Sequence, residues 1–191
     1  EIHADITFSG HPYTPFASLS QEDALNSIAC LSPAKSFNIA SCCTAFTIIA
    51  DETHRKAFQT ENSRLTVNKN NAFANVAMEA AYRSGGDWLD AALGYIAGNL
   101  AMVREQLAQM PEVTLIEPEG TFLVWLDFRA LELSCEELTA FLRNKAGWAV
   151  TAGPAFGEQG KGFARLNIAC TRAKLAVALG QLEKAIAVQA R

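Results

Sequence analysis

The sequence contains no hydrophobic run long enough to span a membrane. A membrane-spanning helix needs about 18 or more consecutive apolar residues, and no apolar run in these 191 residues reaches that length. The opening residues, Glu-Ile-His-Ala-Asp, also lack the basic and apolar segments of a secretory signal peptide. We therefore predict that the protein has no membrane partner.

An excess of basic residues is absent as well. Lysine and arginine number 16, aspartate and glutamate number 20, and the formal net charge is −4. A surface that binds nucleic acid needs clustered positive charge. We therefore predict that the protein has no nucleic-acid partner.

Cysteine patterns that would build disulfides or bind zinc are also missing. The number of cysteines is odd, no two are spaced as C-x-x-C, and the three histidines lie far from any cysteine cluster. Neither a disulfide framework nor a metal site is predicted. Reduced thiols are typical of a cytoplasmic protein, and we predict that location. The cysteines are Cys30, Cys42, Cys43, Cys135 and Cys170.

The first part of the chain combines short apolar runs with helical patterns. Residues 28–31 and 46–50 predict two buried strands, and residues 51–59 predict one or two helical turns. Apolar residues recur at helical spacing over 72–83 and again over 88–110. We expect Gly85 and Gly86 to separate these two helices and Asp87 to cap the second.

The last part of the chain has its own pattern, which predicts a small α/β or α+β domain. Strands are expected at 113–116, 121–128, 148–151 and 163–169, with a helix between the second and third. Ser134 and Glu137 have the spacing of a capping box at the start of that helix. The final helix carries one apolar stripe, formed by Leu175, Leu179, Leu182 and Ile186.

The chain has no initiator methionine and opens on what resembles the end of a strand. We therefore expect a fragment of a longer protein. The alternative is a trimmed form of a complete domain.

One lysine stands out because of its position between the two apolar runs. Lys35 lies in Ser-Pro-Ala-Lys-Ser-Phe-Asn, where a turn can direct its amine into a cleft. Such a lysine can form a Schiff base, which stores the amine as an imine. The alternative is an ordinary loop lysine whose ammonium reaches water.

Two features of the last domain are open to more than one interpretation. The glycine-rich stretch 153–162 does not match the phosphate-binding G-x-x-x-x-G-K-[ST] pattern, so we predict a flexible connection between strands. Arg165 shares one side of its strand with Asn167. Its partner is either a carboxylate at the edge of the core or the carboxylate of a substrate.

Six segments occur in an order that is familiar from one protein family. They are 1–3, 32–40, 80–83 with 88–89, 120–128, 156–157 and 163–170. With these segments the chain resembles the C-terminal half of fold-type I, pyridoxal-phosphate-dependent enzymes in the class I/II aminotransferase superfamily. Within that superfamily it best resembles the cystathionine β-lyase (C–S lyase) branch.

The resemblance implies an α/β fold and a role for four residues. Residues 1–86 are the C-terminal part of the large, cofactor-binding domain, 87–110 a long interdomain helix, and 111–191 the small domain. Lys35 resembles the catalytic lysine that binds pyridoxal 5′-phosphate and moves the substrate α-proton. Ser32 resembles a phosphate contact and His3 a residue beside the cofactor ring oxygen. Arg165 resembles the arginine that binds the substrate carboxylate.

The resemblance also implies an activity on amino acids. It is β-elimination at the C–S bond of cystathionine- or cysteine-type substrates, giving a thiol, pyruvate and ammonia, in a homodimer. The alternatives are an aminotransferase of the same superfamily and an inactive, truncated remnant. Ala34, Ser41 and Cys43 depart from the family pattern, and the aspartate that pairs with the cofactor ring nitrogen precedes Glu1 in the family. The chain alone is therefore expected to be inactive.

Overall fold

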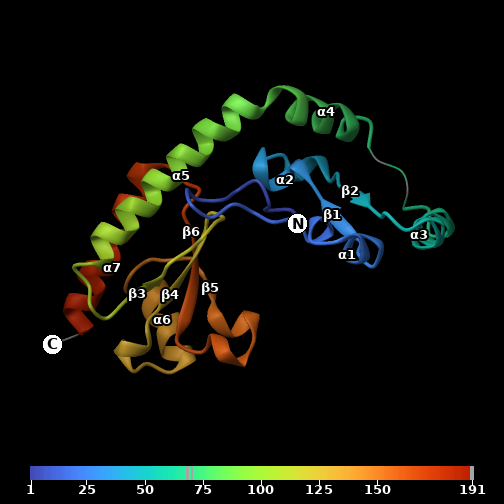
Figure 1. The fold of residues 1–191 in the computed structure, drawn as a ribbon. Coiled ribbons are helices and arrows are strands. Elements are labelled where there is room, and N and C mark those ends of the chain that lie inside the picture. The colour runs from blue at the N-terminus through green and yellow to red at the C-terminus, as the bar shows by residue number, and fades with distance from the viewer. Residues whose placement is uncertain (68, 70, 190–191) are drawn as a thin grey trace. The chain divides into compact units, whose positions relative to one another are not determined.

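The computed structural model describes residues 1–67, 69 and 71–189. The chain forms two compact units, Glu1–Leu93 and Gly94–Arg191, and the boundary between them falls within helix α5, Gly86–Leu107 (Figure 1). Within the described residues, none of the helices combines the length and the apolar character that crossing a membrane requires.

The described residues of the first unit form short strands and four helices before α5 begins. Its two strands, β1 and β2, pair antiparallel, with Ala29 opposite Ile48 and Leu31 opposite Phe46. The elements are α1 (Gln21–Leu25), β1 (Ala29–Leu31), α2 (Pro33–Ser36), β2 (Phe46–Ile48), α3 (Glu52–Arg64) and α4 (Ala74–Ser84), with 3-10 turns η1 (Phe16–Ser18) and η2 (Ala40–Cys42).

The two predicted strands are present, but the prediction that they are buried was wrong. Cys30 at the centre of β1 is exposed, and the residues Ile28 and Ile48 are 52% and 53% exposed. The physical reason is that β1 and β2 form a sheet of only two strands among the described residues. Such a sheet leaves much of its surface open.

Two helices begin or end away from the predicted positions. The predicted turn or two after Asp51 is a helix that continues to Arg64, capped by the Asp51 carboxylate at the His54 N–H (2.7 Å). An ion pair between Lys56 and Glu52 (2.7 Å), four positions apart on its exposed side, stabilises this helix. Asp87 does not cap α5 as predicted, because that helix has already begun at Gly86, but its charge still favours the first turn.

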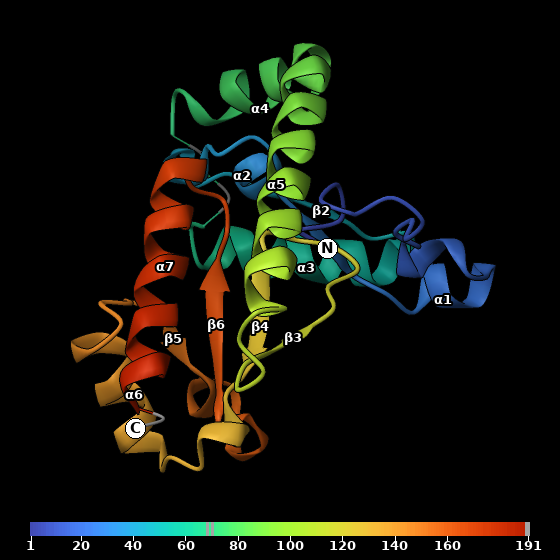
Figure 2. The same ribbon diagram turned by 90° about the vertical axis from the view of Figure 1, so that its left-hand side faces the viewer.

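The second unit is built around a four-stranded antiparallel sheet in the order β3-β4-β6-β5. Trp125 and Thr151 lie opposite Arg165 on the two neighbouring strands. Helices α5 and α7 lie side by side (Figures 1 and 2). The elements are β3 (Thr114–Ile116), β4 (Leu123–Asp127), α6 (Cys135–Asn144), β5 (Thr151–Ala152), β6 (Phe163–Asn167) and α7 (Arg172–Gln189), with 3-10 turn η3 (Arg129–Leu131).

Alternation along β4 and β6 divides the sheet into a core face and an open face. Val124, Leu126 and Ala164 are completely buried, whereas Trp125 and Arg165 are only partly buried. The predicted stripe of α7 is present, and its four apolar residues are all buried. The capping box of α6 is present as predicted, with both reciprocal hydrogen bonds formed.

The glycine-rich stretch 153–162 differs from the predicted flexible connection. It forms two successive 3-10 turns, η4 (Gly153–Phe156) and η5 (Glu158–Gly160). Gly153 and Gly160 are buried against each other, and a Cβ atom on Gly153 would lie 2.0 Å from the Gly160 carbonyl oxygen. Only glycine permits this backbone contact, so the stretch is a packed turn pair.

A single buried amide ties α5 to the end of β6. Asn99 is fully buried, and its Nδ2 donates to the carbonyls of Ile168 (2.8 Å) and Cys170 (2.9 Å). Its Oδ1 accepts a hydrogen bond from Nε of Arg172 (3.2 Å). Both polar atoms of the buried Asn99 side chain are thereby hydrogen-bonded inside the unit.

Replacing Asn99 by leucine should therefore destabilise the protein strongly. Asn99→Leu leaves the Ile168 and Cys170 carbonyls without their donor, at a cost of about 2–4 kcal/mol in the free energy of unfolding. Urea unfolding measures this loss. Ala101→Leu, at an exposed position of the same helix, is the control and should change stability by less than about 0.5 kcal/mol. Equal stability of the two variants would contradict the prediction.

Candidate active site

Lys35 is the third residue of α2, a helix of four residues. The local sequence explains why the helix forms where it does. The Ser32 hydroxyl accepts a hydrogen bond from the Ala34 N–H (3.1 Å), and Pro33 occupies the first helical position. Lys35 is thus carried by a regular element between β1 and β2, where the sequence predicted a turn.

Two buried serines anchor α2, one on each side of Lys35. The Ser32 hydroxyl donates to the Thr44 carbonyl (2.6 Å), and the Ser36 hydroxyl donates to the Asp5 carboxylate (2.6 Å). Both serines are buried. These bonds connect α2 to the segment before β2 and to the opening segment of the chain.

The end of α2 is determined by a left-handed residue. Asn38 has a φ of 55°, and the N–H of Ile39 returns to the Ala34 carbonyl (3.2 Å). This is the six-to-one hydrogen bond of a Schellman ending, and asparagine tolerates the left-handed position better than most residues. The run Ser-Pro-Ala-Lys-Ser-Phe-Asn therefore encodes both ends of the helix.

An aromatic cluster packs beside α2. The Phe37 ring lies edge-on to Tyr82 (5.6 Å between centroids) and 6.3 Å from Trp88. Gly85 packs directly against Phe37, because a Cβ atom there would lie 2.5 Å from the ring. Partial burial raises the pKa of the Tyr82 hydroxyl, and the negative charge of Asp5 raises it further. Tyr82 and Trp88, from the segments 80–83 and 88–89, thus contact the residue that ends the lysine helix.

His3 lies in the opening turn, next to the segment that anchors α2. Its carbonyl accepts a hydrogen bond from the N–H of Ile6 (2.9 Å), a buried residue. The carboxylate of Asp5, two residues further on, binds Ser36. The predicted residues His3, Ser32 and Lys35 therefore belong to one connected part of the first unit.

The Lys35 amine suits the aldehyde of pyridoxal phosphate. The side chain is exposed, and no other residue in 1–67, 69 and 71–189 forms a hydrogen bond or ion pair with its Nζ. An amine without a carboxylate partner is available to react with a carbonyl group. The Ser32 hydroxyl, unlike the Lys35 amine, already has a partner, because it donates its one proton to the Thr44 carbonyl. A phosphate contact through that proton requires Ser32 to give up the Thr44 bond.

Arg165 lies in the second unit, on the open face of the sheet. Its guanidinium carbon is 4.7 Å from the centre of the Phe156 ring. Among the described residues, no carboxylate forms an ion pair with Arg165. The structure therefore offers no core-edge carboxylate for this arginine within those residues, which leaves its in-plane N–H groups for a ligand.

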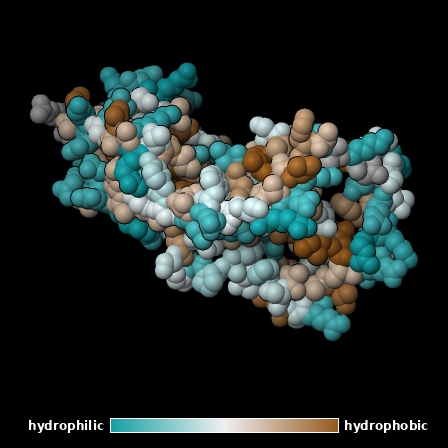
Figure 3. Space-filling view, turned by 90° about the horizontal axis from the view of Figure 1, so that it is seen from above, coloured by the Kyte–Doolittle hydropathy of each residue, from teal (hydrophilic) through white to brown (hydrophobic). Residues whose placement is uncertain are grey.

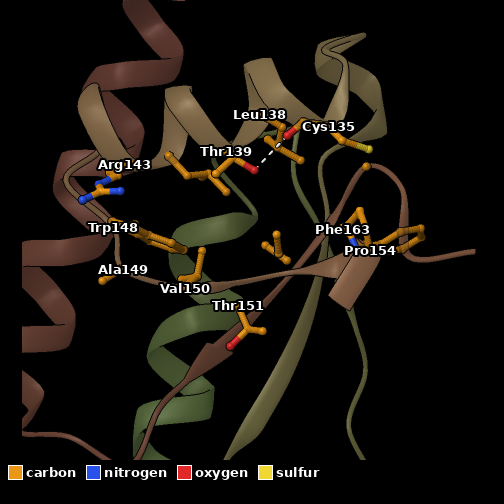
Figure 4. Close-up of a pocket in the computed structure, with 14 residues that line it drawn as sticks. Cys135, Leu138, Thr139, Arg143, Trp148, Ala149, Val150, Thr151, Pro154 and Phe163 are labelled. Carbon is orange, nitrogen blue, oxygen red and sulfur yellow. Dashed lines mark hydrogen bonds between the residues drawn. The ribbon is translucent and has the colours of Figure 1, made fainter. Parts of the chain in front are cut away.

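The cavity in Figure 4 lies elsewhere in the second unit, between α6 and the β5 edge of the sheet. Its volume is about 420 Å³, and apolar side chains such as Leu138, Leu142 and Trp148 form its walls. None of the four predicted site residues lines this cavity. We therefore do not assign this cavity to the reaction proposed for Lys35 and Arg165.

Sequence reasoning did not predict Ser36, Asp5 or Phe156 as part of the site. Ser36 directly follows Lys35, and a serine after the lysine of a short helix was a usable signal for an anchor. No local pattern connects Asp5 to Ser36 across 31 positions of the chain. Phe156 was part of the family pattern, but its contact with Arg165 depends on the folded turns η4 and η5.

Loss of the Ser36 hydroxyl should loosen the helix that carries Lys35. Ser36→Ala removes the bond to Asp5 and should cost about 1–2 kcal/mol of local stability. Faster hydrogen exchange at the Phe37 amide, which bonds to the Pro33 carbonyl (2.9 Å), measures this effect. Ser41→Ala, at an exposed position in η2, is the control. Unchanged Phe37 exchange in Ser36→Ala would contradict the anchoring role.

Comparisons with known proteins agree with these features. No family model matches the sequence. The chain is 39% identical over 187 residues to cystathionine β-lyase PatB of Bacillus subtilis, covering 97% of the chain and 48% of that protein. It is 34% identical over 189 residues to protein MalY of Escherichia coli, covering 97% and 47%.

A solved structure shares the fold closely. The pyridoxal-phosphate-bound putative aminotransferase from Clostridium difficile matches with a TM-score of 0.95 and 39% identity, over 97% of this chain and 48% of that one. The chain thus spans about half the length of the relatives it matches. In sequence and fold, it corresponds to the C-terminal half of a fold-type I, pyridoxal-phosphate-dependent enzyme in the cystathionine β-lyase branch of the class I/II aminotransferase superfamily.

Proposed function

We propose that the chain is part of a pyridoxal-phosphate-dependent C–S lyase. The reaction is β-elimination from cystathionine- or cysteine-type amino acids, which gives a thiol, pyruvate and ammonia. The observation that carries the proposal is the Lys35 amine. It has no ion pair among the described residues, and two buried serine hydrogen bonds anchor the helix that carries it.

Lys35 has two tasks in this proposal. Pyridoxal phosphate, when bound, supplies an aldehyde that condenses with amines and a ring that accepts electrons from the substrate Cα. Lys35 would hold the group covalently through Nζ. The same nitrogen would then serve as the base that takes the proton from the substrate Cα.

Ser32 and His3 are proposed to contact the same group at its periphery. Ser32 would contact the phosphate by donating the proton that Thr44 now accepts (2.6 Å). His3 lies in the opening turn whose neighbour Asp5 anchors α2, and it would approach the ring oxygen. Both roles rest on the family resemblance and on this local connection.

Arg165 is proposed to bind the substrate α-carboxylate. A guanidinium presents pairs of parallel N–H groups that match the two oxygens of a carboxylate. The lack of a carboxylate partner for Arg165 among the described residues supports this role. Such a contact would hold the substrate by its α-carboxylate.

An aminotransferase of the same superfamily is the second candidate. It is favoured by the solved relative, which is described as a putative aminotransferase. Lys35 and Arg165 would serve that reaction equally well. In both reactions the amino acid is held by its α-carboxylate, and its Cα proton is then removed. The products distinguish them, since the lyase releases a thiol and pyruvate from L-cystathionine and the aminotransferase moves the amino group to a keto acid.

Borohydride reduction tests the role of Lys35 directly. In the protein made from its complete reading frame, reduction with bound pyridoxal phosphate should leave the cofactor on the peptide that contains Lys35. Lys35→Ala should lose this label and at least about 10³-fold in activity. Lys145→Ala, at an exposed position, is the control and should keep both. Full activity in Lys35→Ala would refute the assignment.

The 191-residue chain alone is proposed to be inactive. It spans about half the length of its relatives, and the family resemblance places the partner of the ring nitrogen before Glu1. Turnover of L-cystathionine should be measured for the chain alone and for the product of the complete reading frame. Turnover of L-cystathionine by the chain alone would contradict this proposal.

We further propose a cytoplasmic homodimer. Large apolar side chains at the start of α4 are exposed in the first unit, with the N-cap residue Phe73 at 78% and Val76 at 69%, and they suit burial against a second copy. Hydrophobic residues (brown) are interspersed with hydrophilic ones (teal) on the face shown in Figure 3. Cell fractionation followed by size measurement tests the proposal. A monomer, or a protein outside the cytoplasmic fraction, would contradict it.

A further inference from the structure

We propose that Phe156 is a positioning residue, which holds the guanidinium of Arg165 in the orientation that receives a substrate carboxylate. The inference rests on the proposed role of Arg165. It assigns Phe156 to the substrate-binding region. It also gives a physical means by which the open face of the sheet binds a substrate through its α-carboxylate.

Arg165 lies over one aromatic ring, and a second ring supports the first. The Arg165 guanidinium carbon is 4.7 Å from the centre of Phe156, and Phe156 meets Trp125 edge-to-face at 5.4 Å. Trp125 is directly opposite Arg165 in the register of β4 and β6. The arginine is therefore restrained by a side chain that is itself fixed to the neighbouring strand.

This packing leaves the hydrogen-bonding edge of the guanidinium unused. A cation–π contact uses the face of the guanidinium, whereas its N–H groups point outward in the plane. None of the described carboxylates pairs with those groups. The aromatic contact thus restricts the arginine without competing with a carboxylate ligand, which reduces the entropy lost when the ligand binds.

The backbone holds Phe156 in position from its own side. Phe156 ends η4, which is packed through Gly153 against Gly160. The next residue, Gly157, has a φ of 125°, a conformation that side chains rarely permit. Phe156 is 52% exposed, so burial in a core does not explain its place over Arg165.

The far end of the aromatic row is anchored by an ion pair. Trp125 stacks on Phe163 at 5.6 Å, and the Arg129 guanidinium lies 4.8 Å from the centre of that ring. Arg129 also binds the Asp127 carboxylate (2.7 Å), and this hydrogen bond lowers the pKa of Asp127. The two arginines differ in one respect. Arg129 has a carboxylate partner, whereas among the described residues Arg165 has none.

Kinetics of the complete protein with pyridoxal phosphate test the positioning role. Phe156→Leu should raise KM for L-cystathionine by about three- to tenfold, with kcat changed by less than about twofold. Phe156→Tyr keeps an aromatic face and should restore the wild-type KM. Phe16→Leu removes an exposed phenylalanine from η1 and should leave both constants unchanged. An unchanged KM in Phe156→Leu, or failure of tyrosine to rescue, would overturn the inference.

Chemical modification provides a second test that needs neither substrate nor cofactor. The dicarbonyl reagent phenylglyoxal reacts with accessible guanidinium groups, and peptide mass spectrometry gives the rate for each arginine. Removal of the ring should speed modification of Arg165 in Phe156→Leu by about three- to tenfold, but not in Phe156→Tyr. Arg143, an exposed arginine on α6, is the internal reference.

The two tests separate the inference from the proposed function. A protein that binds no cofactor would refute the proposed enzyme, while the Arg165 modification rate would still show whether Phe156 holds the guanidinium. Equal modification rates in wild type and Phe156→Leu would overturn the positioning role even in an active enzyme.

Discussion

The chemistry proposed for the first unit depends on the hydrogen bonds that anchor α2 on both sides of Lys35. A helix of four residues cannot form alone, because nucleation costs more than so few hydrogen bonds return. Ser32 and Ser36 supply the missing stability by bonding to Thr44 and Asp5. The result is a lysine on an anchored helix, with an exposed amine that is unpaired among the described residues. That combination suits a residue that must bind a cofactor covalently and then act as a base at one carbon atom.

The second unit solves a related problem with aromatic contacts. Strand alternation gives the sheet one face for the core and another for Trp125, Phe163 and Arg165. An exposed arginine has many conformations, and ordering it on ligand binding costs entropy. Packing against Phe156 lowers that cost in advance. The two units thus present an amine on an anchored helix and a restrained guanidinium, the groups that the proposed reaction requires for the cofactor and for the substrate carboxylate.

The similarity to lyases and to a putative aminotransferase has a simple chemical basis. Both reactions need a covalently bound cofactor, a base for the Cα proton and a carboxylate-binding group. The residues assigned to these tasks in this chain are common to both, so the fold and the assigned residues do not choose between them. Whether elimination or amino-group transfer follows depends on groups that direct the later steps. The chain spans about half the length of its relatives.

Features that depend on near neighbours in the chain were determined by the sequence itself. The capping box of α6, the stripe of α7 and the order of strands and helices follow from signals within a few residues, as does the short segment that carries Lys35. Tertiary structure alone decided that β1 and β2 are partly exposed and that 153–162 is a packed turn pair. It also decided that Asp5 holds Ser36 and that Phe156 covers Arg165. These outcomes depend on which distant segments meet and on how many strands and helices cover a surface, and no local pattern of residues contains that information.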